Sequence, residues 1–182
     1  MSNDKNTIAV RPARPEDAVQ LRENCFSANT LAEVEARIAD AMRTYEQGTQ
    51  ALFVAEADGA VVGTGTLVRN THPLYAHRGE VVGLVVHPRY QRQGIARRIV
   101  EAIRDQAAAW ELEILEVGCR GGTPAEQVYR RLGFIECGRL PRGIKEPYGE
   151  QRVYDEVSFH MPLGGSKMLA FVKPGSTMKG SL

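Results

Sequence analysis

Hydrophobic positions along this chain form two kinds of pattern, short apolar runs and a helical stripe, and their succession predicts the order of its elements. Two apolar runs in "ALFVAEADGAVVGTGTLV", residues 51–68, predict two strands. Asp58 and Gly59 lie between them and form a dipeptide typical of tight hairpin turns. A period of 3.6 runs through residues 94–110 and predicts a long amphipathic helix. Its apolar stripe is Ile95, Ile99, Ala102, Ile103, Ala107 and Trp110.

The remaining elements come from shorter patterns of the same two kinds. The predicted strands are 7–12, 79–87, 112–118, 134–139 and 153–161, and the further helices start at Pro15, at Leu31 and after Thr123. The helix from 31 to 47 ends at Gly48, and the last helix should open with a capping box of Thr123 and Glu126. A long loop is expected from 140 to 152. This order predicts an α+β fold with a mixed, mostly antiparallel sheet and one central β-α-β crossover.

Length and composition limit the classes of protein to consider. The 182 residues suit one domain, which we place at 1–163, followed by a flexible Gly/Ser/Lys-rich tail at 164–182. A net charge of +1 provides no basic face for nucleic acid, and the apolar runs are too short for a membrane-spanning helix. The start, "MSNDKNTIAV", lacks the apolar core of a signal peptide, so a cytoplasmic location is expected. Three widely spaced cysteines then indicate free thiols.

The stretch "GLVVHPRYQRQGIARRIV", residues 83–100, has the features of an anion site. Gln91, Gly94 and Ala96 fit the pattern Q/R-x-x-G-x-G/A between a predicted strand and the first turn of the long helix. There the unpaired N–H groups and the helix dipole favour an anion, and small residues let phosphate oxygens approach the backbone. The alternative is a solvated basic turn that only starts a helix.

Other phosphate-binding patterns are missing from the sequence. It contains no G-x-x-x-x-G-K-[ST] motif, and "GTGTLV" at Gly63 and Gly65 has neither a third glycine nor a following helix. We interpret these two glycines as a strand bulge or as a place where another backbone passes close.

These motifs carry a family resemblance. The stretch 83–100 resembles the acyl-CoA signature of the GNAT superfamily of N-acetyltransferases, "AEQVYRRLGFIECGRL" resembles its second signature, and "YDEVSFHMPL" resembles its closing strand. The likeness covers roughly residues 8–163. It implies the GNAT fold, acetyl-CoA as co-substrate and no metal. It also implies that the strands 79–87 and 112–118 splay apart around the pantetheine arm.

The resemblance also implies which residues bind the coenzyme. Backbone groups of Leu84, Val85 and Val86 would pair with the pantetheine arm, and a neutral arm with two amides suits such an apolar strand. The turn that follows would hold the pyrophosphate. The residues of this turn are Gln91, Arg92, Gln93, Gly94, Ile95, Ala96 and Arg97.

Acetyl transfer to an amine needs an acid for the leaving thiolate. Tyr129 stands in the family's Y-x-x-L-G-F position as "YRRLGF", and its neutral phenol can donate a proton at neutral pH. The alternative is a half-buried helix tyrosine with a structural role.

A base is also needed, because an alkylammonium with a pKa near 10 is only about one part in a thousand neutral at pH 7. Glu80 is the candidate, since strict alternation would put it on one face with Val82, Leu84 and Val86 and into the same cleft. Glu116, Asp155, Glu156 and a chain of water molecules are the alternatives. The oxyanion donor would be a backbone N–H near Val85 or Val86.

A few residues depart from the family pattern or suggest other chemistry. Gly122 in "CRGGT" stands where relatives often carry an Asn that contacts CoA. Cys119 is a conceivable acyl acceptor, but a buried thiol without a paired base is the favoured interpretation. His72 and His77 flank a proline loop and make a poor metal site, which favours solvated loop residues.

The two N-terminal helices and the loop "LPRGIKEPYGEQ" would bind the acceptor substrate and determine the specificity for it. The charges in these segments are mixed: Glu33, Glu35, Asp40, Arg142, Lys145, Glu146 and Glu150. This balance favours a small zwitterionic or neutral amine over a strongly cationic one. The sequence therefore predicts an N-acetyltransferase that acts by direct attack of a small-molecule primary amine. The alternatives are a protein or peptide N-acetyltransferase and a non-catalytic acyl-CoA-binding sensor, and the resemblance adds an expectation of homodimers.

Overall fold

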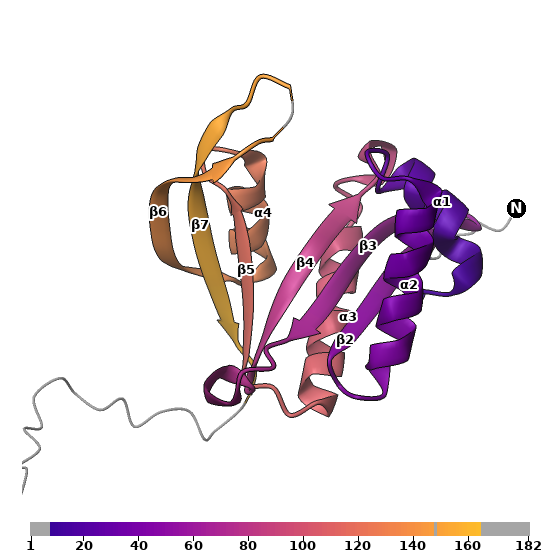
Figure 1. The fold of residues 1–182 in the computed structure, drawn as a ribbon, viewed down its shortest axis with the longest axis horizontal. Coiled ribbons are helices and arrows are strands. Elements are labelled where there is room, and N and C mark those ends of the chain that lie inside the picture. The colour runs from indigo at the N-terminus through magenta and orange to yellow at the C-terminus, as the bar shows by residue number, and fades with distance from the viewer. Residues whose placement is uncertain (1–7, 148, 165–182) are drawn as a thin grey trace, which may run out of the picture.

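A computed structural model describes residues 8–147 and 149–164, and in these the chain forms one seven-stranded sheet with four α-helices (Figure 1). The strand order is β1-β2-β3-β4-β5-β7-β6, and β4 with β5 is the parallel pair. The predicted mixed α+β fold is confirmed. Residues 165–182 of the predicted tail lie outside the described residues. The elements are β1 (Ala9–Pro12), α1 (Ala18–Asn24), α2 (Leu31–Tyr45), β2 (Gln50–Ala57), β3 (Ala60–Arg69), β4 (Arg78–Val86), α3 (Ile95–Ala109), β5 (Ile114–Arg120), α4 (Pro124–Leu132), β6 (Ile135–Lys145) and β7 (Val153–Pro162).

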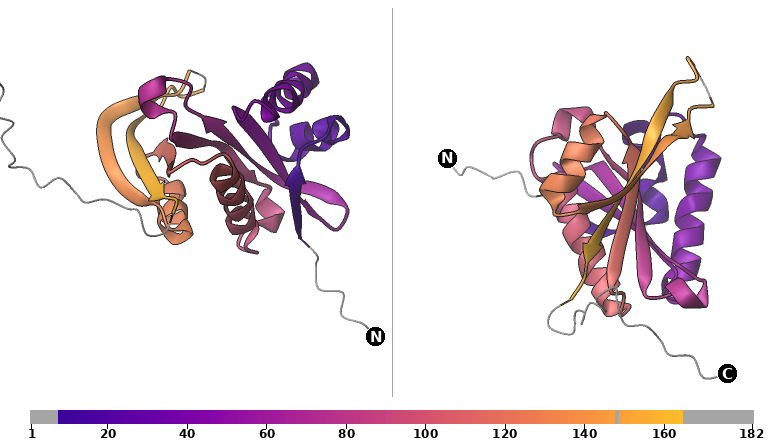
Figure 2. Two further views of the ribbon diagram at one scale, coloured as in Figure 1. Left: turned by 90° about the horizontal axis from the view of Figure 1, so that it is seen from below. Right: turned by 90° about the vertical axis from the view of Figure 1, so that its left-hand side faces the viewer.

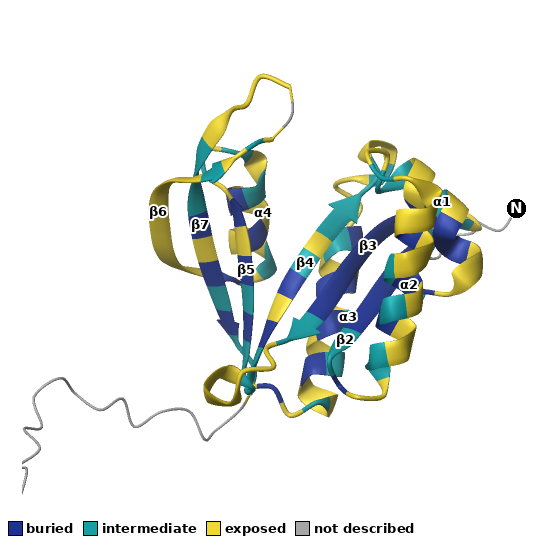
Figure 3. Cartoon of the chain, viewed as in Figure 1, coloured by how far each residue is buried: buried dark blue, intermediate teal, exposed yellow. Residues whose placement is uncertain are grey.

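Helices cover both faces of the sheet, so the central strands are buried on two sides. Helices α1 and α2 lie over one face and α3 over the other (Figure 2). Alternate residues of β2 therefore enter different cores: Leu52 and Val54 pack under α1 and α2, while Phe53 and Ala55 pack under α3. Figure 3 shows this burial in β2 and β3 and the contrasting exposure of β6. Among the described residues no helix is long and apolar enough to cross a membrane.

The hairpin and the long helix follow their predicted patterns. Asp58 and Gly59 have φ angles of 52° and 75°, the left-handed pair that a two-residue hairpin turn requires. In α3 the residues Ile95, Ile99 and Ile103 are buried, as the apolar stripe predicts.

Gly63 and Gly65 make room for this helix. A Cβ atom on Gly65 would lie only 2.8 Å from Cγ2 of Ile99, and one on Gly63 would lie 3.1 Å from Cδ1 of the same side chain. We expected a strand bulge or a second backbone at these glycines, and β3 does shift register next to Gly63 against β2 and at Gly65 against β4. The atoms closest to the two Cβ positions belong to side chains of α3. Without these two side chains, α3 packs directly on the sheet.

Strands β4 and β5 pair only at their starts. Their register covers Arg78, Glu80 and the residue between them, opposite Ile114 to Glu116. Beyond that point the two strands diverge, and Figure 1 shows the two parts of the sheet opening from a shared base. The splay that the family resemblance implies is therefore present.

Two local predictions were wrong. Strand β6 continues to Lys145, where a loop was expected from residue 140, because β7 supplies backbone partners as far as Val153. The capping box of α4 is also missing. The Thr123 hydroxyl donates to the Arg120 carbonyl (2.7 Å), and the Glu126 carboxylate accepts from the Gly122 N–H.

Candidate active site

A cavity of about 430 Å³ lies between β4, the start of α3 and helix α4. Its walls are Leu84 and Val86 of β4, the turn from Gln91 to Arg97, and Tyr129 of α4. The volume lies within the usual range for small-molecule sites, about 300–1,000 Å³. One cavity thus brings together most of the residues that the sequence selected, while Val85, Gln93 and Glu80 are not among those that line it.

The turn before α3 presents free backbone donors to this cavity. Gly94 caps the helix with φ of 82°, and the first helical hydrogen bond runs from the Arg98 N–H to the Gly94 carbonyl. The N–H groups of Ile95, Ala96 and Arg97 therefore have no acceptor within the helix. A Cβ on Gly94 would meet no atom of the described chain within 4 Å. The chain itself thus requires the glycine for its left-handed backbone, and the missing side chain also leaves the donors accessible.

Side chains of the same turn hold its shape. The Gln91 amide donates to the Val86 carbonyl (3.1 Å), and the Gln93 amide donates to the Arg89 carbonyl (3.3 Å). Both glutamine side chains thus contact the backbone of the turn itself. The Arg97 side chain donates to the Arg131 carbonyl of α4 (3.1 Å). The donors of the turn without a partner among the described residues are the main-chain N–H groups at the start of α3 and the Arg92 side chain.

The edge of β4 that faces β5 has no strand partner beyond Glu80 in the described chain. On its other edge, Val85 pairs with Thr64 of β3. The backbone groups between Val81 and Val86 that point to this edge consequently have no strand partner there, and the Val86 carbonyl accepts the hydrogen bond from the Gln91 amide. Such an edge can accept an extended chain as an additional strand.

A β-bulge at Gly83 changes which residues share a face of β4. Thr66 pairs with Val82 and Thr64 with Val85, so two residues of β4 stand opposite one of β3. Gly83 adopts φ of 61°, and Cδ1 of Leu84 lies on the α3 side of the sheet, 3.3 Å from where Gly65 would carry a Cβ.

The expected single face of Glu80, Val82, Leu84 and Val86 is therefore wrong. Leu84 and Val86 line the cavity on the α3 side. A Cβ on Gly83 would point to Phe26 and Arg37 of the opposite layer. Alternation from Val81, which is buried in the core under α3, places Glu80 and Val82 on that opposite side as well.

Tyr129 forms part of the cavity wall and is only 9% exposed. Its ring packs edge-on against Phe134, with 5.8 Å between centroids. Burial raises the pKa of the Tyr129 phenol to about 12, so the hydroxyl stays protonated at neutral pH. Among the described residues none is hydrogen-bonded to this hydroxyl, which leaves it available as a donor to a ligand.

Helix α4 is held in place by a buried carboxylate. Glu126 accepts a hydrogen bond from the Gly122 N–H and forms ion pairs with Arg130 (3.1 Å) and Arg139 (2.9 Å). Arg139, the Gly122 N–H and Arg130 together lower the pKa of Glu126 to about 2. These contacts join α4 to the end of β5 and to β6, and so position Tyr129.

The carboxylates proposed as bases have different surroundings. Loss of surrounding water raises the pKa of Glu80, and the negative charges of Glu116 and Glu156 raise it further. Glu116 forms an ion pair with Arg78, whose Nε lies 2.9 Å from Oε2. Asp155 accepts the Arg142 N–H (3.0 Å) within the β6–β7 hairpin. Within the described residues Glu80 and Glu156 therefore differ from Glu116 and Asp155 in that neither accepts a hydrogen bond or forms an ion pair.

Cys119 and His72, which suggested other chemistry in the sequence, lie in surroundings that favour a structural role. Cys119 is buried, and burial raises the pKa of its thiol, which favours the neutral form. His72 accepts the Leu74 N–H at Nδ1 (3.3 Å) in an exposed turn. In the part of the chain that the structure describes, no three His, Cys, Asp or Glu side chains form a group that could hold a metal ion.

Several residues of the cavity wall were not selected from the sequence. They are Tyr90, Pro124, Ala125, Val128, Arg131 and Leu132. The sequence could have identified Leu132 as part of the wall, because it follows Tyr129 by three residues and therefore lies on the same face of the helix. No local pattern marks Tyr90, which reaches the cavity from the turn after β4.

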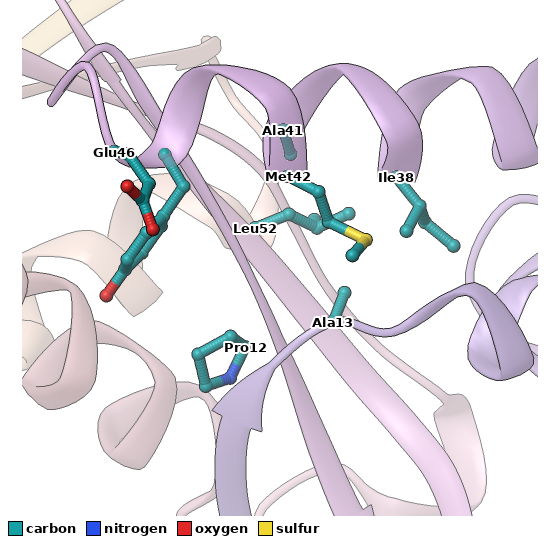
Figure 4. A pocket seen from close by; sticks show the side chains of 8 residues that line it. Pro12, Ala13, Ile38, Ala41, Met42, Glu46 and Leu52 are labelled. Atoms are coloured by element: carbon teal, nitrogen blue, oxygen red, sulfur yellow. The ribbon is translucent and has the colours of Figure 1, made fainter.

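A second cavity, of about 270 Å³, lies between α2 and the first two strands (Figure 4). Ile38, Ala41 and Met42 of α2 line it together with Pro12, and Glu46 adds one carboxylate. Its walls come from the β1 side of the sheet. None of its lining residues belongs to the turn before α3 or to the diverging strands.

Comparisons with known proteins agree on one family. Residues 16–134 match the sequence model of the acetyltransferase (GNAT) family. An IAA acetyltransferase of Azospirillum brasilense is 37% identical over 99 residues, which are 53% of this chain and 59% of that protein. The match therefore spans less than two thirds of the relative's own length.

Solved structures share the fold. A phosphinothricin acetyltransferase from Sinorhizobium meliloti, in complex with acetyl-CoA, superposes with a TM-score of 0.75 at 19% identity and covers 93% of this chain and 97% of its own. The protein yncA of Salmonella typhimurium, solved with its cofactor acetyl-CoA, gives a TM-score of 0.73 at 19% identity over 90% and 98%. At this identity the likeness concerns the fold.

Proposed function

The chain belongs to the GNAT family of acetyltransferases, and from that premise we propose that it transfers an acetyl group from acetyl-CoA to the primary amine of a small molecule by direct attack. One observation carries the proposal. The cavity runs from the free N–H groups at the start of α3, past the unpaired edge of β4, to the Tyr129 side chain.

The residues of the cavity fit acetyl-CoA in their chemistry. The N–H groups of Ile95, Ala96 and Arg97 form an anion site at a helix N-terminus and would hold the pyrophosphate. The backbone from Leu84 to Val86 would pair with the pantetheine arm, and its apolar side chains suit that neutral chain. Bound acetyl-CoA supplies the activated thioester.

Tyr129 is proposed as the acid. Its hydroxyl is protonated at neutral pH and has no described partner, and Tyr129 lines the same cavity as Leu84. A positioned donor of this kind can give a proton to the sulfur of the leaving thiolate. The burial of its ring against Phe134 and Phe159 holds the hydroxyl in one place.

Glu80 is proposed as the base, acting from the α1–α2 side of the sheet. The bulge at Gly83 separates it from the cavity wall, so the amine would approach β4 from the face opposite α3. Glu80 would then accept the ammonium proton directly or through water. Its raised pKa makes the carboxylate a better proton acceptor than an ordinary glutamate.

A narrow approach favours a small acceptor over a peptide. On the α1–α2 side, Phe26 and Arg37 lie within about 4 Å of the position of a Cβ on Gly83. This pair limits the room above the bulge. A small amine needs less of that room than a peptide chain does.

An acceptor screen tests the proposal. Release of CoA thiol is followed with single amino acids, polyamines, aminoglycosides and short peptides, and mass spectrometry identifies the acetylated product. We expect turnover with at least one small primary amine. Turnover only with peptides would support the protein acetyltransferase instead. Tight CoA binding with no turnover on any amine would support the non-catalytic sensor.

A further inference from the structure

We propose that Arg37 binds an anionic group of the acceptor, so that the acceptor is a primary amine with a carboxylate close to the amine, of which an α-amino acid is the simplest form. The inference rests on the proposed function and gives its substrate class. It concerns the α1–α2 face of β4 and not the cavity for the coenzyme.

Arg37 lies in the middle of α2 and turns inward. Its side chain is half-buried, although Glu35 and Ala36 beside it are exposed. The guanidinium carbon lies 4.7 Å from the centre of the Phe26 ring, a cation–π distance. Phe26 follows α1 and is itself half-buried. The two side chains together fix a positive charge against the sheet.

This charge lies directly over the bulge in β4. Arg37 Nη1 is 3.9 Å, and Phe26 Cε1 is 4.0 Å, from the position of a Cβ on Gly83. A Cβ on Gly83 would be in ordinary van der Waals contact with both side chains, and the φ of 61° is one that glycine adopts at little cost. A small molecule bound at the bulge would therefore meet the guanidinium.

No carboxylate of the described residues lies within 4.0 Å of the Arg37 guanidinium. Glu33, one helical turn earlier, accepts the Thr30 N–H at 2.7 Å and caps the helix. Hydrogen bonds from Thr30 lower the pKa of Glu33, and the positive charge of Arg37 adds a smaller contribution without an ion pair between the two side chains. By contrast, Arg43 of the same helix is paired with Asp40. A partly desolvated guanidinium without a close partner is suited to bidentate binding of a carboxylate.

The same face of the sheet carries the complementary charges. Glu80 precedes Gly83 by three residues, or about 10 Å along the strand. Glu116 and Glu156 lie near enough to Glu80 to raise its pKa, and Arg78 offsets the charge of Glu116. One end of this face is therefore positive and the other negative. That arrangement matches a zwitterion, with its carboxylate on Arg37 and its ammonium towards Glu80.

Matched substrates test the inference in the wild-type protein. The twenty L-amino acids are compared with their carboxamides and with the corresponding decarboxylated amines, by CoA release and mass spectrometry of the products. We expect kcat/KM for the best amino acid to exceed that of its amide and of its amine by about 10- to 100-fold, the worth of a hydrogen bond between charged groups.

Variants assign the preference to one residue. Arg37→Gln should lower kcat/KM for the amino acid by about the same factor and change that for the amide by less than about threefold. Arg37→Lys should restore part of the loss, because it keeps the charge. Arg43→Gln is the matched control on the same helix, 69% exposed, and should leave both values unchanged.

The outcomes separate the two proposals. Equal use of acids and amides by the wild-type protein, or an equal loss on both in Arg37→Gln, would overturn the inference and leave the proposed function intact. If no amine is acetylated although CoA binds, both are overturned. The wild-type comparison decides the matter even where Arg37→Gln fails to fold. Phe26→Leu, which loosens the guanidinium, should then raise KM for the acid more than it changes kcat.

Discussion

Replacing Tyr129 with phenylalanine removes the proposed proton donor and little else. The side chain is 9% exposed, and its ring contacts Phe134 at 5.8 Å and Phe159 at 5.9 Å between centroids. Phenylalanine can keep both contacts. Because none of the described residues is hydrogen-bonded to the hydroxyl, its removal leaves no buried group unpaired. We therefore expect the free energy of unfolding to change by less than about 1 kcal/mol.

The effect on turnover should be much larger. A positioned general acid typically contributes about 10²- to 10⁴-fold, or roughly 3–5 kcal/mol of activation free energy. We expect kcat for Tyr129→Phe to fall by that factor, with the affinity for CoA nearly unchanged. Since the pKa of Tyr129 is raised to about 12, the phenol of the free enzyme stays protonated through pH 10. The wild-type rate should therefore show no alkaline decline from this group below that pH.

The assay is CoA thiol release with a saturating amine, with CoA affinity from calorimetry and stability from thermal unfolding. Tyr45→Phe provides a matched control, because the Tyr45 hydroxyl donates to Gln106 (2.6 Å) away from the cavity. It should cost about 1 kcal/mol of stability and leave kcat unchanged. A folded Tyr129→Phe protein with kcat within twofold of wild type would refute the acid role. A loss confined to CoA affinity would reduce Tyr129 to a binding residue.

Three further changes probe the turn, the base and the core. Gly94→Ala and Gly59→Ala both force alanine into a left-handed backbone, and each should lower the free energy of unfolding by about 1–2 kcal/mol, measured by thermal unfolding. Only Gly94→Ala should also weaken CoA binding in calorimetry. Equal CoA affinities of the two variants would argue against the phosphate turn. Glu80→Gln should lower kcat/KM by about 10²-fold or more and abolish the acid limb of its pH profile. In the wild type this limb should lie above the usual glutamate pKa, because the carboxylate is the active form and its pKa is raised. An unchanged pH profile in the variant would rule out Glu80 as the base. Gly65→Ala puts a Cβ 2.8 Å from a side chain of α3 and should lower the free energy of unfolding by about 1–3 kcal/mol, measured by denaturant unfolding. An unchanged denaturant midpoint would mean that the helix can shift to make room.

Elements with a local cause could be predicted from the sequence. The apolar stripe of α3 defines which face of the helix is buried, whatever that face packs against. Asp58 and Gly59 specify their hairpin turn through the φ angles of these two residues alone. The turn at Gly94 was also predictable, because the switch from an apolar strand to an amphipathic helix places free N–H groups at one point.

Features that depend on a distant partner could not be predicted. The bulge at Gly83 arises in the pairing of β4 with β3, and a single extra residue transfers Glu80 to the other face of the sheet. The extension of β6 depends in the same way on β7. Arg37 reaches Gly83 from 46 positions earlier in the chain, through the packing of α2 on the sheet. No local sequence pattern contains that contact.

The most direct test of the account is a crystal structure of the protein with coenzyme A. We expect the pyrophosphate within hydrogen-bonding distance of the N–H groups of Ile95, Ala96 and Arg97. The pantetheine arm should lie along β4 from Leu84 to Val86, with its sulfur near the Tyr129 hydroxyl. A nucleotide bound in the cavity between α2 and β1, or a pyrophosphate that contacts only arginine side chains, would contradict the account.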